Sequence, residues 1–230
     1  MATNKNQQTP IEESRTKTET FILANKKVIS IVVIAVLVVV AGVILLNSLY
    51  LQPRQVDAST AIAKGQELFA QEQYEKALNG DGAGYAGFLK VIDEYGCTDA
   101  GNLAKLYAGL CYAQMGKYTE AESQLKDYSP AGDALVSPAA MAALGNVYAS
   151  LNKLDDAVST LKKAAKMANS ESATGHNVSL APQFLLQAGK ILESQGKTAE
   201  ALEIYQDIKK NYINSPVSRE IDKYIERTTK

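Results

Sequence analysis

The side chains that most often bind transition metals or act as nucleophiles are rare in this 230-residue sequence, which contains one histidine and two cysteines. Zinc sites, haem sites and disulfide frameworks all need several such residues at set spacings. His176 stands in the loop-like segment Gly175-His176-Asn177 with no cysteine or second histidine nearby, so we expect a solvated side chain. The sequence therefore predicts no metal site and no cofactor.

The two cysteines, Cys97 and Cys111, stand in a segment that is predicted to be mostly helical. Such a helix would separate their Cα atoms by roughly 18 Å, whereas a disulfide needs a separation below about 7 Å. We therefore expect two free thiols, with Cys111 on the closely packed face of its helix.

The segment from Asn79 to Lys90 resembles a calcium-binding loop, because it has Asn79, Asp81 and a glycine at the sixth position. Its twelfth position is Lys90, where such a loop requires a glutamate that binds through both carboxylate oxygens. The glycines of the same segment lack a following Gly-Lys-Ser/Thr, which a phosphate-binding loop needs. The segment is therefore predicted to be a flexible loop between helices.

The acidic residues offer no paired carboxylates for acid–base chemistry. Asp93-Glu94 and Asp155-Asp156 are adjacent in sequence, so the two side chains of each pair point in different directions on a helix. Across the chain, 24 Lys and Arg residues balance 25 Asp and Glu residues, for a net charge of -1. No excess positive charge is left to neutralise phosphates, so we expect no nucleic-acid-binding protein. Because the sequence offers no convergent set of acid, base, nucleophile or metal ligands, we also expect no enzyme.

The apolar residues are concentrated in one stretch, Val28 to Leu46, and no charged residue occurs between Lys27 and Arg54. As a helix this stretch spans roughly 28 Å, close to the thickness of the hydrocarbon core of a bilayer. A cleaved signal peptide is the alternative, but its apolar core is shorter, and no convincing Ala-x-Ala site follows here. We predict an uncleaved transmembrane helix at residues 28–51.

The charges beside this helix predict its orientation, because Lys and Arg accumulate on the cytoplasmic side of a membrane. The flanking residues are Arg15, Lys17, Lys26 and Lys27 before the helix, and Arg54 and Lys64 after it. The predicted organisation is a disordered cytoplasmic tail at residues 1–27, the membrane helix at 28–51, a linker at 52–57, and a domain at 58–230 on the outer face. In a bacterium this places the domain in the periplasm of a single-pass inner-membrane protein.

Small residues recur at fixed spacing through the last of these segments. They occur in pairs, in which a glycine in one predicted helix is followed, after a tight turn, by an alanine in the next. The pairs are Gly65 with Ala77, Gly109 with Ala121, Gly145 with Ala157, and Gly189 with Ala201. Small residues at these positions let two antiparallel helices approach closely, and apolar residues around them recur at helical spacing. The pattern predicts an all-α domain of helical hairpins.

This pattern resembles the tetratricopeptide repeat, from which it departs in having no Trp and in intervals of 44, 36 and 44 residues between successive glycine landmarks. The resemblance implies an all-α fold in which a single N-terminal transmembrane helix precedes a tetratricopeptide-like solenoid. A solenoid needs a last helix with a polar outer face. We expect Ser215 and Pro216 to start this capping helix, whose apolar stripe is Val217, Ile221, Tyr224 and Ile225.

The order of a short tail, one span, a linker and divergent repeats resembles YfgM-like proteins, as do Tyr85-Ala86-Gly87-Phe88 and Ala100-Gly101-Asn102-Leu103-Ala104. That resemblance implies a periplasmic repeat domain ancillary to the Sec translocon, with a PpiD-type peptidyl-prolyl isomerase and exported unfolded clients as partners. A structural subunit of another cell-envelope or secretion complex is the alternative function.

In tetratricopeptide arrays the first helices of the hairpins line a concave groove, and this resemblance supplies the candidate partner-binding residues. They are Ile62, Phe69, Leu103, Leu106, Leu110, Asn146, Leu186 and Lys190. Apolar residues at helical spacing also form protein cores, so the same leucines could instead be packed inside the domain or covered by the C-terminal helix. The sequence leaves both interpretations open.

Overall fold

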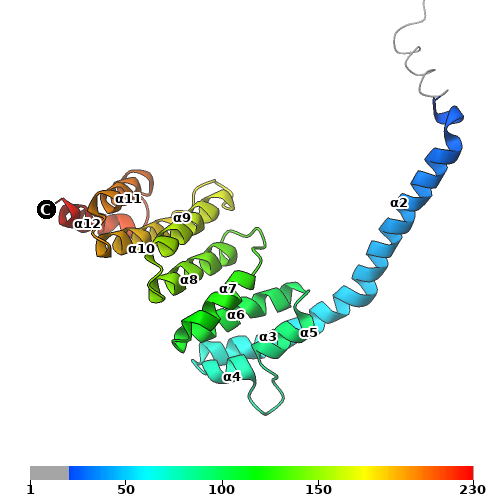
Figure 1. Ribbon diagram of the computed structural model, residues 1–230, viewed down its shortest axis with the longest axis horizontal. Coiled ribbons are helices and arrows are strands. Elements are labelled where there is room, and N and C mark those ends of the chain that lie inside the picture. Colours follow the sequence, from blue (N-terminus) through cyan, green and yellow to red (C-terminus); the bar gives the residue numbers. More distant parts are fainter. Residues whose placement is uncertain (1–20, 230) are drawn as a thin grey trace, which may run out of the picture. The chain divides into compact units, whose positions relative to one another are not determined.

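The computed structural model describes residues 21–229, and every regular element in this range is a helix (Figure 1). The chain divides into two compact units, residues 1–53 and residues 54–230. The predicted all-α class with a tetratricopeptide-like helical domain is confirmed. Of the predicted tail, residues 1–20 lie outside the described range.

The first unit contains α2 (Lys26–Leu46), none of whose residues is buried, and the π-helical turn η1 (Asn47–Leu51). The helical backbone runs unbroken from Lys26 to Ala70 and, among the described residues, forms the one helix long and apolar enough to cross a membrane. A signal sequence near the N-terminus can also meet this criterion of length and composition. Residues 52–57, expected to be a linker, are the first residues of α3 (Gln52–Ala70).

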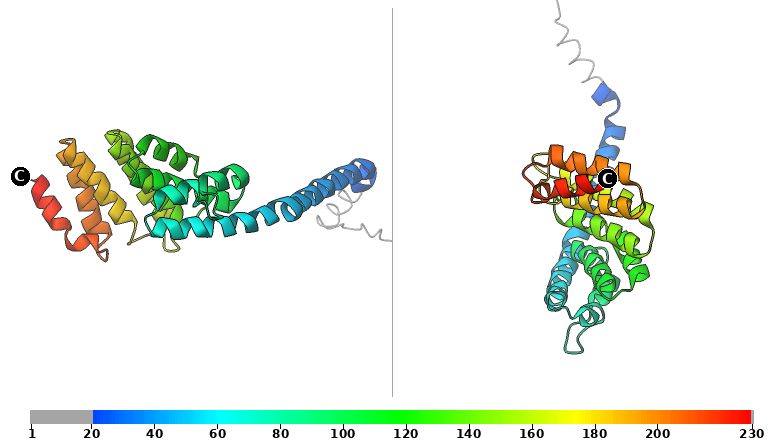
Figure 2. Two further views of the ribbon diagram at one scale, coloured as in Figure 1. Left: turned by 90° about the horizontal axis from the view of Figure 1, so that it is seen from below. Right: turned by 90° about the vertical axis from the view of Figure 1, so that its left-hand side faces the viewer.

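The second unit is built from helices that pair into hairpins (Figure 2). The hairpins are α3 with α4 (Tyr74–Asn79), α6 (Asp99–Gln114) with α7 (Tyr118–Asp127), α8 (Val136–Ser150) with α9 (Leu154–Ser170), and α10 (Ala181–Ser194) with α11 (Thr198–Asn211). An additional helix, α5 (Phe88–Tyr95), follows the first hairpin. The 3-10 turn η2 (Val217–Arg219) and α12 (Ile221–Thr228) end the chain.

The four hairpin turns share one backbone geometry. Each has a residue in the left-handed region: Glu72, Gly116, Asn152 and Gly196, with φ between 58° and 74°. In each turn the next residue donates a backbone hydrogen bond to the residue five positions earlier, as Lys117 does to Tyr112 at 2.9 Å and Lys153 to Tyr148 at 2.8 Å. This pattern closes the first helix and reverses the chain, and glycine or asparagine adopts its left-handed position most easily.

The glycine landmarks are the points where the two helices of a hairpin touch. A Cβ atom on Gly109, Gly145 or Gly189 would lie 2.6, 2.9 or 2.3 Å from the nearest atom of Leu125, Leu161 or Tyr205, respectively. Real Cβ atoms do not approach other atoms so closely, so a larger residue at any of these three crossings would force the facing side chain to move. The close approach predicted from the small residues is confirmed, and its second partner is the side chain 16 positions after the glycine, which the sequence analysis did not identify.

The first hairpin reaches the same contact by another route, because α4 ends at Asn79 before a corresponding side chain can be placed. Tyr85 and Phe88 fill the space instead, at 2.1 and 2.4 Å from the Cβ position of Gly65. The buried Tyr85 hydroxyl donates a hydrogen bond to the Ala77 carbonyl at 2.9 Å. The intervening loop is tied together by the Asp81 carboxylate, which accepts backbone hydrogen bonds from Ala83 and Tyr85.

The buried apolar side chains form three clusters along the stack. One joins α3, α4, α5 and α6; the next joins α6, α7 and α8; and the last joins α8 through α12. Helices α6 and α8 contribute to two clusters each, so each hairpin buries apolar surface against its neighbour. Burial against a neighbour is what stabilises a repeat that cannot enclose a core alone.

The C-terminal cap differs in one respect from the expected single helix beginning at Pro216. The buried Ser215 hydroxyl accepts a hydrogen bond from the Ser218 amide, which stabilises the short 3-10 turn η2, and α12 begins only at Ile221. Val217, Ile221 and Tyr224 are buried and Ile225 is half-buried against the last cluster, as predicted for the apolar stripe.

A ladder of ion pairs joins the hairpin turns to the preceding hairpins. Lysines at equivalent turn positions each reach back to an acidic residue: Lys117 to Glu75 at 3.9 Å, Lys153 to Glu122 at 2.6 Å, and Lys197 to Asp155 at 2.6 Å. Glu122 also pairs with Lys126 at 2.5 Å, and its side chain is only 12% exposed. These contacts align each hairpin with the one before it.

We expect Glu122→Gln to lower the free energy of unfolding by about 0.5–1 kcal/mol at pH 7, the range for a pair whose lysines are half-exposed. Hydrogen bonds from Lys126 and Lys153 lower the pKa of Glu122 from its ordinary value of 4.5. Its contribution is therefore complete above that ordinary value and is lost as the pH falls through the lower pKa of the folded state. Denaturant midpoints of the two proteins should differ at pH 7 and converge at acid pH, once Glu122 is protonated in the folded state.

The matched control is Glu120→Gln on the same helix, since Glu120 is exposed and forms no ion pair within the described residues. A loss at pH 7 that is equal for both variants, or one that persists at low pH, would contradict the role of the ladder.

Candidate partner-binding surface

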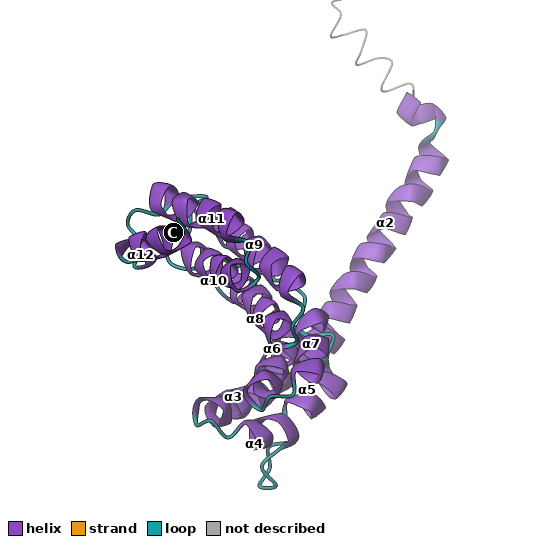
Figure 3. Cartoon of the chain, turned by 60° about the vertical axis from the view of Figure 1, so that its left-hand side comes forward, coloured by secondary structure: helices purple, strands orange, loops and turns teal. Residues whose placement is uncertain are grey.

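Within residues 54–229 the hairpins stack in a curved row. Helices α3, α6, α8 and α10 lie on the inner side of the curve, and α7, α9 and α11 lie on the outer side (Figure 3). The first helix of each hairpin thus lies on the inner side, as the resemblance to tetratricopeptide arrays predicted when it supplied the candidate residues. The inner helices carry all of these residues.

Three of the candidate residues are core side chains. Ile62, Leu106 and Leu186 are 5%, 7% and 8% exposed, and each belongs to a different apolar cluster. Leu106 packs with side chains of α7 and α8, including Leu125 and Val147, and α12 belongs to another cluster. For these three residues the packing interpretation therefore holds, and the helices that cover Leu106 are its immediate neighbours in the stack and not the C-terminal helix.

Three other candidates on the inner helices, Phe69, Leu103 and Leu110, are half-buried. Leu103 packs against both the first and the second cluster, and Leu110 packs against the second. Phe69 makes edge-to-face contacts with Tyr74 and Tyr107, each at 5.4 Å between ring centroids. Each of these side chains therefore keeps part of its surface exposed, while its packing contacts hold it in place.

The remaining two candidates, Asn146 and Lys190, are exposed. The Lys190 ammonium lies 5.2 Å from the centre of the Tyr224 ring, and Lys223 and Arg227 lie 4.9 and 5.0 Å from the same ring. Side chains of α12 therefore border the inner surface where α10 ends the row of first helices. The structure brings Lys190 together with this basic group, which sequence reasoning did not anticipate.

The basic group has a half-buried counter-charge in Glu193. Glu193 accepts a hydrogen bond from the Tyr205 hydroxyl at 2.6 Å and pairs with Arg227 at 2.6 Å. Burial opposes ionisation of Glu193, but the hydrogen bonds from Arg227 and Tyr205 outweigh it and lower its pKa. Glu193 is therefore a carboxylate that holds α12 against α10 and α11.

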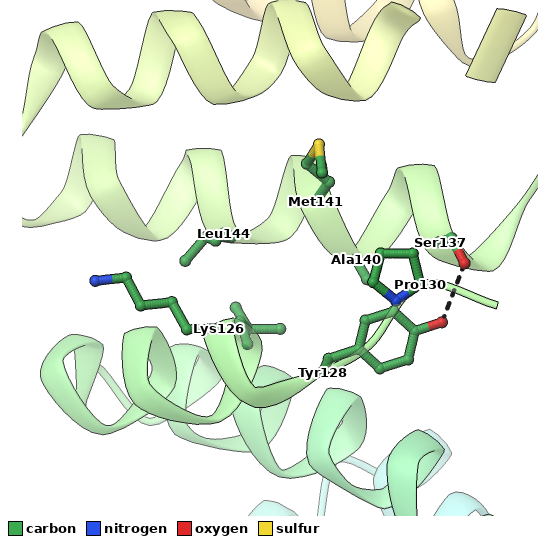
Figure 4. Close-up of a pocket in the computed structure, with 8 residues that line it drawn as sticks. Lys126, Tyr128, Pro130, Ser137, Ala140, Met141 and Leu144 are labelled. Carbon is green, nitrogen blue, oxygen red and sulfur yellow. Dashed lines mark hydrogen bonds between the residues drawn. The ribbon is translucent and has the colours of Figure 1, made fainter. Parts of the chain in front are cut away.

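A small apolar pocket of about 190 Å³ lies between α7, the loop after it, and α8 (Figure 4). Its walls are Leu125, Lys126, Tyr128, Pro130, Ser137, Ala140, Met141 and Leu144. The hydroxyls of Tyr128 and Ser137 are 3.3 Å apart, and the Ser137 hydroxyl donates to Asp133 at 2.6 Å. These hydroxyls are satisfied within the domain, so the pocket offers apolar contact and little hydrogen bonding to an occupant.

The groups that could do chemistry are dispersed. Within residues 21–229 no group of three His, Cys, Asp or Glu side chains could hold a metal ion. Both cysteines are free thiols, as predicted; Cys97 is exposed, and burial raises the pKa of Cys111 to about 12. The expectation of a solvated His176 is corrected: its ring stacks on Tyr212 at 4.5 Å and its Nε2 bonds the Asn211 carbonyl at 2.7 Å, because the chain folds the α11 end against this loop.

Comparison with protein families matches residues 20–215 to the tetratricopeptide repeat-like domain. The chain belongs to this family. Tetratricopeptide repeat-like domains are generally non-catalytic scaffolds for protein–protein interaction. Comparison with curated proteins found no match.

Membership in the tetratricopeptide repeat-like family accounts for the dispersed polar groups, because a scaffold needs a shaped surface and no convergent reactive set. Phe69, Leu103, Leu110, Asn146 and Lys190 lie on the inner helices, and Lys223 and Arg227 of α12 complete the basic group at Lys190. η2 and α12 lie beyond the matched residues, so the basic group combines a side chain of the repeat with side chains of a C-terminal addition.

Proposed function

We propose that this protein is an inner-membrane-anchored periplasmic scaffold, ancillary to the Sec translocon, whose repeat domain at residues 58–230 holds protein partners. The observation that carries the proposal is the unbroken helical backbone from the apolar α2 into α3, the first helix of the repeat unit. One chain thus combines a helix with the length and composition of a membrane span and a domain of an interaction family.

The orientation in this proposal follows from charge. Lys26 and Lys27 immediately precede the apolar residues, and the next basic residue after them is Arg54. Positive charge is retained on the cytoplasmic side, so the N-terminus stays inside and the repeat domain is exported. An uncleaved span at residues 28–51 then keeps the domain next to the membrane, where newly exported chains emerge.

The partners in this proposal are the translocon, a PpiD-type periplasmic peptidyl-prolyl isomerase and unfolded exported clients. The similarity to YfgM-like proteins in the order of segments and in Tyr85-Ala86-Gly87-Phe88 supports these partners. Binding of extended chains is supported by the inner helices, because the half-buried Phe69, Leu103 and Leu110 leave apolar surface exposed on the same helices as the exposed Asn146 and Lys190. Apolar contact with flanking polar groups is the usual composition of a transient binding surface.

Topology is tested with reporters. A reporter that is active only in the periplasm should be active when fused after Lys230 and inactive when fused before Met1. The reverse result rejects the translocon-exit function as well as the topology. A mature protein that begins after Leu51 would identify the apolar helix as a cleaved signal.

Partners are tested by purifying the full chain from detergent-solubilised membranes and identifying proteins recovered in stoichiometric amounts. We expect translocon subunits and a peptidyl-prolyl isomerase, and we expect Asn146→Glu with Lys190→Glu to reduce their recovery. Lys162→Glu on α9 is the matched control, because Lys162 is exposed on an outer helix. Stoichiometric recovery of a different envelope or secretion complex would replace the translocon assignment.

A further inference from the structure

The exposed large apolar side chains of the repeat unit are confined to one set of segments. Within residues 54–229 they are Val56, Leu135, Val136, Val178 and Ile213, which are 65%, 64%, 42%, 39% and 72% exposed. All five stand at the start of a first helix or in a loop between hairpins. None of them stands at the four hairpin turns.

Hydrogen bonds join these segments into one continuous edge, which we call the loop edge. At its beginning the Ala100 amide donates to the Gln55 side chain at 3.4 Å, and Asn102 exchanges two hydrogen bonds with the Ser129 backbone at 2.7 and 2.9 Å. Further along, the Asn177 side chain donates to the Ala134 carbonyl at 3.3 Å.

The same chain of contacts reaches the last loop, because His176 bonds the Asn211 carbonyl and stacks on Tyr212. The loop edge therefore extends from the start of α3 to the segment that holds Ile213. The five exposed apolar side chains share one border of the domain and are not scattered over its surface.

The opposite border, formed by the four hairpin turns, is polar and carries none of the exposed large apolar side chains. It carries Glu72, Gly116, Asn152 and Gly196 together with the lysine ladder. Single exposed apolar residues are normal on a protein surface, but their restriction to one border needs a cause. Stacking of the repeats provides none, because stacking buries the faces of the hairpins and leaves both borders in contact with solvent.

The position at which the chain enters the unit suggests the cause. The unit begins at Arg54, in the first turn of α3, and Gln55 is already part of the loop edge. The covalent connection to the apolar helix is therefore made at the loop edge and not at the hairpin turns.

We propose that the loop edge contacts the interface of the lipid bilayer, with Leu135, Val136, Val178 and Ile213 inserting among the lipid headgroups. This inference rests on the membrane anchor of the proposed function. A tether raises the effective concentration of the bilayer at the domain, so a few aliphatic side chains suffice for contact where a free domain would bind weakly. Acidic residues such as Asp99, Asp133 and Glu171 occupy the same edge, so the contact is apolar and does not depend on anionic lipids.

The test uses the full chain in vesicles of zwitterionic phosphatidylcholine whose acyl chains carry bromine. A fluorophore whose emission is quenched by bromine is attached to the cysteine of Ile213→Cys. The exposed Cys97 is replaced (Cys97→Ser) so that it is not labelled. Cys111 can stay, because it is fully buried and its raised pKa keeps it unreactive in the folded protein. The matched control carries the same fluorophore at Gln71→Cys, an exposed position at the first hairpin turn. We expect bromolipid to quench the fluorophore at residue 213 and to leave that at residue 71 unaffected.

A second probe position, Val178→Cys, guards against a local effect of the label and should be quenched in the same way. Adding Leu135→Ser and Ile213→Ser to this probe should remove the quenching. Equal quenching at both borders, or none at the loop edge, overturns the inference. Protection of residue 213 from aqueous iodide without bromolipid quenching would show that a protein covers this edge, and also overturns it. Failure of the protein to float with the vesicles would instead reject the membrane anchor itself.

Discussion

Leu106→Asp is expected to lower the free energy of unfolding by about 4 kcal/mol or more, because the substitution removes a core leucine and places a carboxylate in its space. Leu106 is 7% exposed and belongs to the cluster that joins α6 to α7 and α8. For a domain of this size the melting temperature should fall by roughly 10 °C. Thermal unfolding of the full chain in detergent micelles, followed by circular dichroism, measures the change.

The matched control is Asn146→Asp, which introduces the same carboxylate at an exposed position of an inner helix. Its effect should stay within about 0.5 kcal/mol, as for other surface substitutions. If Leu106→Asp melts like the original protein but fails to recover partners, then Leu106 is an accessible contact residue and its assignment to the core is wrong.

Gly101→Ala is expected to destabilise the protein although alanine is the better helix former. A Cβ atom at Gly101 would lie 1.9 Å from the Tyr95 carbonyl oxygen, 2.5 Å from its carbon and 2.9 Å from the Gly96 Cα. All three are backbone atoms, so no side-chain rotation relieves the clash. Overpacking of this kind costs about 3 kcal/mol, and the gain in helix propensity returns about 1 kcal/mol. The net loss of about 2 kcal/mol corresponds to a melting temperature lower by about 6 °C.

The backbone around Gly101 leaves little room for adjustment. The Thr98 hydroxyl accepts a hydrogen bond from the Gly101 amide at 3.0 Å and donates one to the Tyr95 carbonyl at 2.8 Å. These bonds fix the turn between α5 and α6. As a control for propensity alone, Ala139→Gly at an exposed position of α8 should cost about 1 kcal/mol. A Gly101→Ala protein that melts above the original would show that α5 can move away from α6.

The sequence by itself determined the elements whose cause is local or periodic. The uncharged run from Val28 to Leu46 indicated a helix of bilayer length, and the structure has a helix there. The glycine and alanine landmarks indicated hairpins, because the space between two crossing helices depends on the size of the residues at the crossing. The capping stripe at Ile221 and Tyr224 followed from helical periodicity, although the 3-10 turn before it did not.

Tertiary structure alone decided which side chains of the inner helices remain accessible. Leu103, Leu106 and Leu110 repeat at helical spacing and look alike in sequence, yet Leu106 is buried and the other two are only half-buried. The difference depends on how closely α7 and α8 approach α6. The sequence of α6 alone does not determine that distance.

The sequence also did not predict the contacts between residues that are far apart in the chain. Tyr85 and Phe88 fill a space that exists because α4 is short, and His176 stacks on Tyr212, which is 36 positions later in the chain. Sequence periodicity reports which residues share one helix face. The angle and distance at which separate hairpins stack arise only when their surfaces pack together, and these decide the core, the loop edge and the candidate partner-binding surface.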